Sequence, residues 1–240
     1  MNVVKILAGV LVLGALGLSA SNAAAQPPMI SHKPKILLHV KATTVKNPCV
    51  ATGVTACTQA VSSGSLNTNY HVQVLVAEWD SLDTADSGIA GVQFGLDYVG
   101  GFDATGNPAL AIDIFAWTLC ATLEFQTPAP SPIWPNPGAG NLITWDAVNT
   151  CQKNATATAG FFYLSAYMPS TLKLVPRPID NVAKIADCGS VETLLTPVEL
   201  GSAAFSAGGV TQGCNPCVMG CGVVAIQPTT WSSIKTLNSH

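Results

Sequence analysis

The chain has few charged residues and lacks the motifs of the common enzyme classes. Asp, Glu, Lys and Arg make up only 10% of its 240 residues, whereas a soluble domain usually has about a quarter. Ten basic residues against thirteen acidic ones give a net charge of −3, and no basic cluster occurs, which argues against a nucleic-acid partner. The patterns G-x-S-x-G and H-E-x-x-H and the Walker loop are missing, so the sequence does not favour an enzyme.

One long apolar run is present, Ile6–Ala20, near the start of the chain. It follows Lys5 and precedes the small residues Ala23–Ala25, as in a secretory signal peptide with an A-x-A-type cleavage site. We therefore expect residues 1–25 to be removed and the product to be secreted, periplasmic or at the cell surface. No later run is long enough for a membrane span after cleavage.

Helical periodicity is missing as well, and from residue 35 onward apolar residues recur with a period of two. Clusters of Gly, Pro, Asn and Asp separate these runs, which predicts seven to nine short strands. The expected fold is all-β: an antiparallel β-sandwich of cohesin-like or Ig-like topology, stapled by disulfides. The expected strands are Lys35–Lys41, Tyr70–Trp79, Val92–Tyr98, Leu110–Thr118, Leu142–Trp145, Gly160–Met168 and Thr171–Val175, with weaker ones near Ala203–Phe205 and Val223–Ile226.

The run Val92–Tyr98 shows the alternation most clearly. Val92, Phe94, Leu96 and Tyr98 are expected on the core side, and Gln93 on the opposite, less buried side.

The chain divides into a signal peptide at 1–25, an N-terminal tail at 26–34, a β-sandwich domain at 35–200 and a Cys-rich C-terminal segment at 201–240. The last segment ends in a short irregular tail. There Trp231 and Ile234, three residues apart after Pro228, either fold back over the domain or dock on another subunit.

Eight cysteines behind a signal peptide predict disulfides, because the exported compartment is oxidising. Cys49 and Cys57 bracket a short loop and are expected to pair, as are Cys120 and Cys151, which bracket a proline-rich loop. The remaining four are Cys188 and the cluster Cys214, Cys217 and Cys221. Three clustered cysteines cannot all pair with one another, so one of them is expected to reach Cys188. A zinc site formed by these four is the less favoured alternative.

The segment Ser87–Tyr98 resembles a recurring strand of cohesin-like and related carbohydrate-binding-type β-sandwiches, in which a glycine-bearing entry precedes an alternating strand. The likeness extends over about residues 70–180 and implies a recognition module. The order of Trp117, Cys120, Cys151, Cys188, Cys214 and Trp231 is also similar to that of secreted bacterial proteins, which implies no particular activity.

The proline-rich loop around Trp134 is the first candidate ligand-binding site. Its prolines stiffen the backbone, so Trp134, with Asn136 and Asn141 beside it, is expected either to offer a flat apolar face to a sugar or protein, or to cover a sheet edge.

Asp80, Asp83 and Asp86 are a candidate calcium site, because three carboxylates close in sequence end at the glycine turn of Gly88. Their spacing of three does not match an EF-hand-like loop, and an ordinary turn explains the same residues. Calcium is therefore possible, and no other cofactor is expected.

Together these features predict a secreted, non-catalytic binding module for an extracellular glycan or protein partner. The alternative is a structural subunit of a surface layer or filament, for which self-association is possible. A hydrolase is less favoured, since His39 and His71 lie within strand-like runs and lack an evident nucleophile.

Overall fold

The computed structural model describes residues 33–43, 48–49, 54, 56–77, 88–99 and 111–222. These residues form twelve strands and three short 3-10 turns. The strands are β1 (Lys35–Ala42), β2 (Ser63–Ser65), β3 (Asn69–Ala77), β4 (Gly91–Asp97), β5 (Ile112–Leu119), β6 (Leu123–Gln126), β7 (Gly140–Thr144), β8 (Thr156–Ala166), β9 (Ser170–Val175), β10 (Ala183–Ala186), β11 (Glu192–Leu195) and β12 (Ser202–Ser206). Within the described part of the chain, no helix is both long and apolar enough to cross a membrane.

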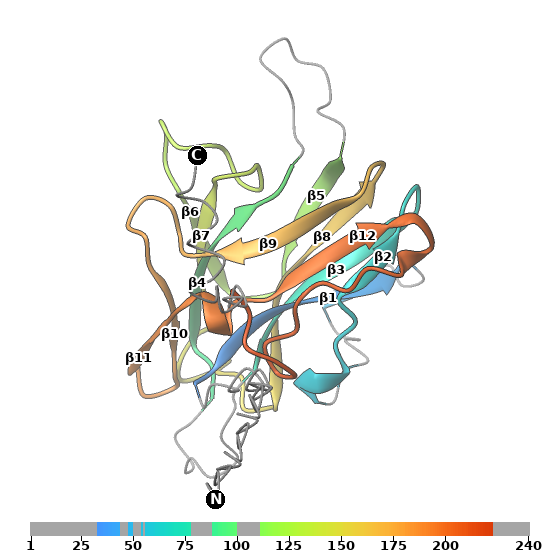
Figure 1. Ribbon diagram of the computed structural model, residues 1–240. Helices are drawn as coiled ribbons and strands as arrows, with labels where there is room; N and C mark the ends of the chain where they lie inside the picture. The colour runs from blue at the N-terminus through green and yellow to red at the C-terminus, as the bar shows by residue number, and fades with distance from the viewer. Residues whose placement is uncertain are drawn as a thin grey trace, which may run out of the picture.

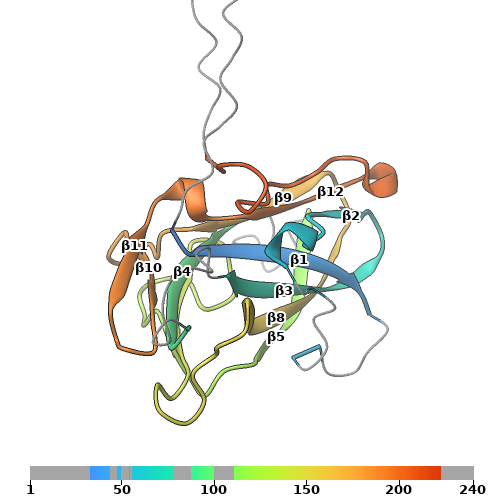
Figure 2. The same ribbon diagram turned by 90° about the horizontal axis from the view of Figure 1, so that it is seen from below.

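The strands make two sheets, and the expected all-β sandwich is confirmed. The four-stranded sheet has the order β1-β3-β8-β5. The eight-stranded sheet has the order β11-β10-β4-β9-β12-β2, and β7 pairs with β4 and carries β6 at its outer side. Every named pairing is antiparallel except that of β12 with β2. Figures 1 and 2 show β9 and β12 in one layer and β1, β3, β8 and β5 in the other.

The inner faces of both sheets form one core. On β4, Val92, Phe94 and Leu96 are at most 1% exposed, as the alternation predicts, and Tyr98 just beyond the strand is also buried. The facing positions of β3 and β8 are equally apolar, with Val72, Val74, Val76, Phe162 and Leu164 fully buried.

Gln93, on the other side of β4, is also buried, so its expected exposure was wrong. The segment after β9 folds over it, and its Nε2 donates to Asp180 Oδ2 at 3.0 Å and to the carbonyl of Val182 at 3.1 Å. A buried amide with two acceptors keeps its hydrogen bonds on leaving water, which is why a polar residue is tolerated there.

Most strands lie where the period of two places them, and the exceptions are the shortest ones. The sequence did not indicate β2, β6, β10 and β11, which have only three or four residues each. Such runs are too short to show alternation and depend on neighbours in the sheet. The expected strand Val223–Ile226 and the terminal tail lie outside the described residues.

Part of the outer face of the four-stranded sheet is covered by the described residues between β1 and β2, 48–49, 54 and 56–62, which we call the covering segment. Leu37 and Leu75 pack there against Val54 and Cys217 in a second, smaller cluster. Gln73 is fully buried, and its Nε2 donates to the carbonyl of Pro48 at 2.6 Å. β1 and β3 are therefore buried on both faces along part of their length, with Leu37 and Leu75 as apolar residues of the outer face.

All eight cysteines form disulfides, but both specific pairings expected from the sequence were wrong. The bonds join Cys49 to Cys120, Cys57 to Cys217, Cys151 to Cys188 and Cys214 to Cys221. None of the eight is free, so the thiolate zinc site is also excluded.

The physical reason lies in the covering segment. Because this segment crosses the outer face of the four-stranded sheet, Cys49 reaches the end of β5, and Cys57 reaches the C-terminal loop through Cys217. The expectation that one of the clustered cysteines reaches Cys188 was therefore also wrong: Cys217 bonds to Cys57, and Cys188 bonds to Cys151.

Non-reducing proteolysis followed by mass spectrometry will test this connectivity. We expect linked peptides for Cys49–Cys120, Cys57–Cys217, Cys151–Cys188 and Cys214–Cys221. A linked peptide containing Cys49 and Cys57, or Cys120 and Cys151, would contradict the covering of the four-stranded sheet, because that covering requires the long-range bonds.

Candidate functional site

Trp134, the first candidate from the sequence, is buried and presents no face to a ligand. Only 6% of it is exposed, and its ring packs at 5.2 Å against Trp117, at 5.6 Å against Phe94 and at 5.8 Å against Phe162. The proline-rich loop therefore inserts its tryptophan between the two sheets. The recognition role is thus corrected, and the buried ring lies between the two sheets, not over a sheet edge as the other alternative expected.

Asn136 and Asn141, the two asparagines near Trp134, do not form a binding site together. Asn141 is fully buried on β7, where its Nδ2 donates to Glu124 Oε2 at 2.7 Å, so it faces no ligand. The same carboxylate oxygen accepts from Trp117 Nε1 at 2.9 Å. Asn136 is exposed, and its backbone closes the turn after Ile133.

The calcium candidates Asp80, Asp83 and Asp86 lie outside the described residues. Within the residues that are described, no group of three His, Cys, Asp or Glu side chains is placed to hold a metal.

The two strand histidines both have structural contacts. His39 Nδ1 accepts the backbone N–H of Val61 at 3.0 Å, and burial, with a smaller contribution from Lys41, lowers the pKa of His39. The His71 ring packs at 5.0 Å against Phe161 and at 5.8 Å against Tyr163. Neither arrangement resembles a base that activates a nucleophile.

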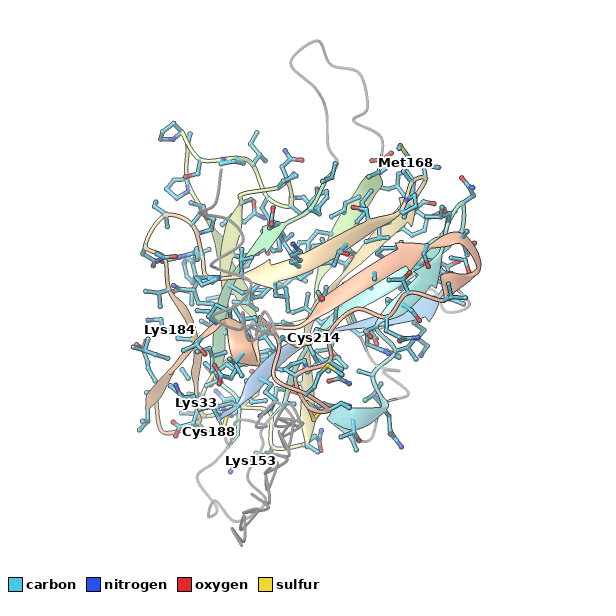
Figure 3. The ribbon with its side chains drawn as sticks, viewed as in Figure 1. Lys33, Lys153, Met168, Lys184, Cys188 and Cys214 are labelled. Atoms are coloured by element: carbon cyan, nitrogen blue, oxygen red, sulfur yellow. A yellow bond between two sulfur atoms is a disulfide. The ribbon has the colours of Figure 1, made fainter. Side chains whose placement is uncertain are left out.

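Among the described residues, a groove of about 300 Å³ lies on the outer face of the eight-stranded sheet and could receive a ligand. It lies over β4, between β7 on one side and the β10–β11 hairpin on the other. Figure 3 shows Lys184, Cys188 and Lys33 on the side of the molecule where the β10–β11 hairpin lies. Lys33 donates to the carbonyl of Leu194 at 3.0 Å and so ties the entry of β1 to β11.

The floor of the groove consists of small side chains in one cross-strand row. Gly91 on β4 pairs with Thr144 on β7 and with Ala186 on β10. A Cβ added at Gly91 would lie 3.5 Å from the Ala186 Cβ and 3.8 Å from the Thr144 Cγ2, which are ordinary contacts. The hollow therefore exists because Gly91 has no side chain, and no neighbour requires the glycine.

The walls of the groove carry polar groups that are already paired within the protein. Lys184 Nζ and Glu192 Oε1 form an ion pair at 2.6 Å across β10 and β11. Asp187 Oδ1 accepts the backbone N–H of Val191 at 2.8 Å. With one ammonium and two carboxylates, the groove has a net charge of about −1 at neutral pH.

Large apolar side chains rise on both sides of this floor. On β6, Leu123 and Phe125 are each 55% exposed, and they pair with Thr144 and Leu142 of β7. On β11, Leu194 is 61% exposed and pairs with Lys184. This site was not predicted from the sequence because β6, β10 and β11 are too short to show alternation. The only signal was the presence of leucines and Phe125 in these short runs.

Comparison with known proteins gives a fold-level likeness only. No family model and no curated protein matches the chain. Two solved structures are similar to it, each at 10% identity, a TM-score of 0.39 and 99% coverage of the known chain. One is the cohesin module of a family 33 glycoside hydrolase from Clostridium perfringens, matched over 73% of this chain. The other is the sixth cohesin of scaffoldin B from Acetivibrio cellulolyticus, in complex with a mutant Cel5 dockerin, matched over 72%.

The burial of Trp134 is testable by truncation. Trp134→Ala should lower the free energy of unfolding by about 3–5 kcal/mol, because it empties a space between Phe94, Trp117 and Phe162. Asn136→Ala, in the same loop but exposed, should change it by no more than about 0.5 kcal/mol. Urea unfolding of the two variants measures both values, and equal values would mean that Trp134 lies outside the core.

Proposed function

We propose that the protein is a secreted, non-catalytic recognition module that binds a protein partner through the groove on its eight-stranded sheet. The observation that carries this proposal is the hollow over Gly91 between two raised apolar borders, Leu123 and Phe125 on β6 and Leu194 on β11. Such a recess, surrounded by exposed aliphatic and aromatic side chains, is typical of a surface that receives an anchor residue of a partner.

The chemistry of the groove favours a protein over a sugar. A sugar ring is usually held by an accessible aromatic face, but Trp145 in the groove wall is only 6% exposed, and of the three exposed border residues only Phe125 is aromatic. Leu123 and Leu194 are aliphatic and suit the side chains of a protein. From β6 to β11 the surface crosses four strand spacings of about 4.8 Å, or about 19 Å, which is wide enough for a helix or two strands.

The paired polar groups support binding without catalysis. Glu192 is engaged by Lys184, and Asp187 by the backbone of Val191, so neither carboxylate is placed as an acid or base for a reaction. The signal-like segment before residue 26 and four disulfides are consistent with export to an oxidising compartment.

A structural subunit is the second candidate, favoured by strand β6. Among the described residues β6 pairs only with β7, and it exposes Leu123 and Phe125 beside its open edge. An open edge with large apolar residues is a site for self-association. Light scattering over a range of concentrations distinguishes the two: a recognition module stays monomeric without its partner, whereas a subunit assembles.

Photo-crosslinking identifies the partner of the groove. A benzoylphenylalanine at Leu194 should capture a protein from the medium of the producing cells, whereas the same probe at Val218, exposed elsewhere on the surface, should not. Capture of a second copy of this chain would favour the structural subunit, and equal capture at both positions would contradict the groove.

Filling the groove should then abolish binding without unfolding the domain. Gly91→Ala adds one methyl at ordinary contact distances and Gly91→Val adds three carbons, so the affinity for the captured partner should fall stepwise, by roughly tenfold or more for Val. Phe125→Ala should cost about 1–3 kcal/mol of binding free energy. Ala207→Val, an exposed control, should bind like the wild type. Calorimetric titration measures these affinities, and unchanged binding by Gly91→Val would contradict the site.

A further inference from the structure

A row of aromatic side chains crosses the open half of the outer face of the four-stranded sheet. Lys41 on β1 pairs with His71 on β3, His71 pairs with Tyr163 on β8, and Tyr163 pairs with Ala116 on β5, beside Phe115. Because directly paired residues point to the same face, these side chains form one line across the sheet. We call it the aromatic row. It lies on the sheet opposite to the groove (Figure 2).

A β-bulge on β5 lets Phe115 face outward in this row while Trp117 still faces the core. The register shifts between Ile114 and Ala116, which leaves Phe115 as the extra residue. Without the bulge, alternation from the inward Ile114 would place Ala116 inside and Trp117 outside. With it, Phe115 and Ala116 are both exposed, and Trp117 packs inward against Phe162. Bulges on edge strands often redirect a side chain in this way.

The rings of the row contact one another, and a hydrogen bond from Asn69 holds the ring of Tyr163. Phe115, 45% exposed, lies 5.2 Å from Tyr163, and Tyr163 lies 5.8 Å from His71. Asn69 Nδ2 donates to the Tyr163 hydroxyl at 3.0 Å, which fixes that ring. Burial, followed by a smaller effect of Lys41, lowers the pKa of His71, so its imidazole is neutral at neutral pH.

Polar groups border the row on one side, and the covering segment closes the other. The next pairs outward are Asn69 with Ser165 and Ser165 with Asp113, which add an amide and a carboxylate. On the inner side, Gln73 and Phe161 are buried, and Gln73 is bonded to Pro48. The open strip is thus bounded on both long sides.

The dimensions of the strip exclude an ordinary protein interface. Three strand spacings of about 4.8 Å make it about 14 Å long, and one to two residue rows give an area of roughly 150–200 Å². A stable protein interface buries about 800 Å² on each partner. A chain of a few sugar rings fits this length and width.

We propose that the aromatic row is a binding site for an uncharged oligosaccharide. The C–H faces of sugar rings stack on aromatic faces, which Phe115 and Tyr163 supply, and the sugar hydroxyls meet Asn69 and Asp113 at the border. The charges of Lys41 and Asp113 lie at opposite ends and cancel, which matches a neutral ligand better than an acidic one. Since this site and the groove are on different sheets, one molecule can hold a glycan and a protein together.

Calorimetric titration of the full protein with defined oligosaccharides tests the proposal. The probes are hexaoses of β-1,4-linked glucose, xylose and N-acetylglucosamine, with an oligogalacturonate as the acidic comparison. We expect at least one neutral hexaose to bind and the oligogalacturonate not to bind. Phe115→Ala should weaken that binding roughly tenfold or more, and Tyr163→Phe, which removes the hydroxyl, should weaken it less.

The matched control is Phe125→Ala, which removes an equally exposed aromatic ring from the opposite sheet. It should leave glycan affinity unchanged, and both phenylalanine variants should keep the melting temperature of the wild type. The proposal fails if none of the neutral hexaoses binds, if only the acidic one binds, or if Phe115→Ala and Phe125→Ala weaken binding equally. It also fails if Phe115→Ala lowers the affinity for the protein partner of the groove and leaves the affinity for the oligosaccharide unchanged. Its outcome is independent of the groove, which the Gly91 variants test separately.

Discussion

The structure depends on the burial of β1 and β3 on both faces. Their inner residues, such as Ile36 and Val74, belong to the core between the sheets, and their outer residues Leu37 and Leu75 are just as fully buried. A sheet in an antiparallel sandwich normally exposes one face, so apolar residues on the outer face require a further layer. The covering segment supplies part of that layer, and the only regular element among its described residues is the short 3-10 turn Cys57–Gln59.

Two disulfides attach the covering segment to the rest of the domain. Cys49–Cys120 fixes one part of the covering segment to the end of β5, and Cys57–Cys217 fixes the next part to the C-terminal loop. Bonds that span 71 and 160 residues restrict the unfolded chain strongly, and such restriction commonly contributes about 2–5 kcal/mol per bond. The face beyond Gln73 stays open, and the aromatic row lies there.

The two proposed sites are formed by local departures from regular strands. The groove exists because Gly91 leaves a gap in a row of paired side chains, whose neighbours Thr144 and Ala186 are small as well. In the aromatic row, the bulge at Phe115 lets Phe115 and Ala116 both face outward while Trp117 still packs against the core. Neither feature disturbs the core, since Val92 beside Gly91 and Trp117 beyond Phe115 both keep their inward positions. A sandwich can therefore acquire binding surfaces on opposite sheets without loss of packing.

The sequence by itself determined the all-β class, the longer strands and the inward residues of β4, because alternation over six or more residues depends only on the two-residue period of a strand. It also indicated that the cysteines are oxidised, since that follows from the compartment. Tertiary structure alone decided the rest. Cysteine partners depend on which loops cross which face, so near neighbours such as Cys49 and Cys57 do not pair. Trp134 is buried because a space between Phe94 and Phe162 receives it, and proline content does not reveal that space. The groove and the aromatic row combine residues from strands far apart in the chain, whose register is set only when the sheets assemble.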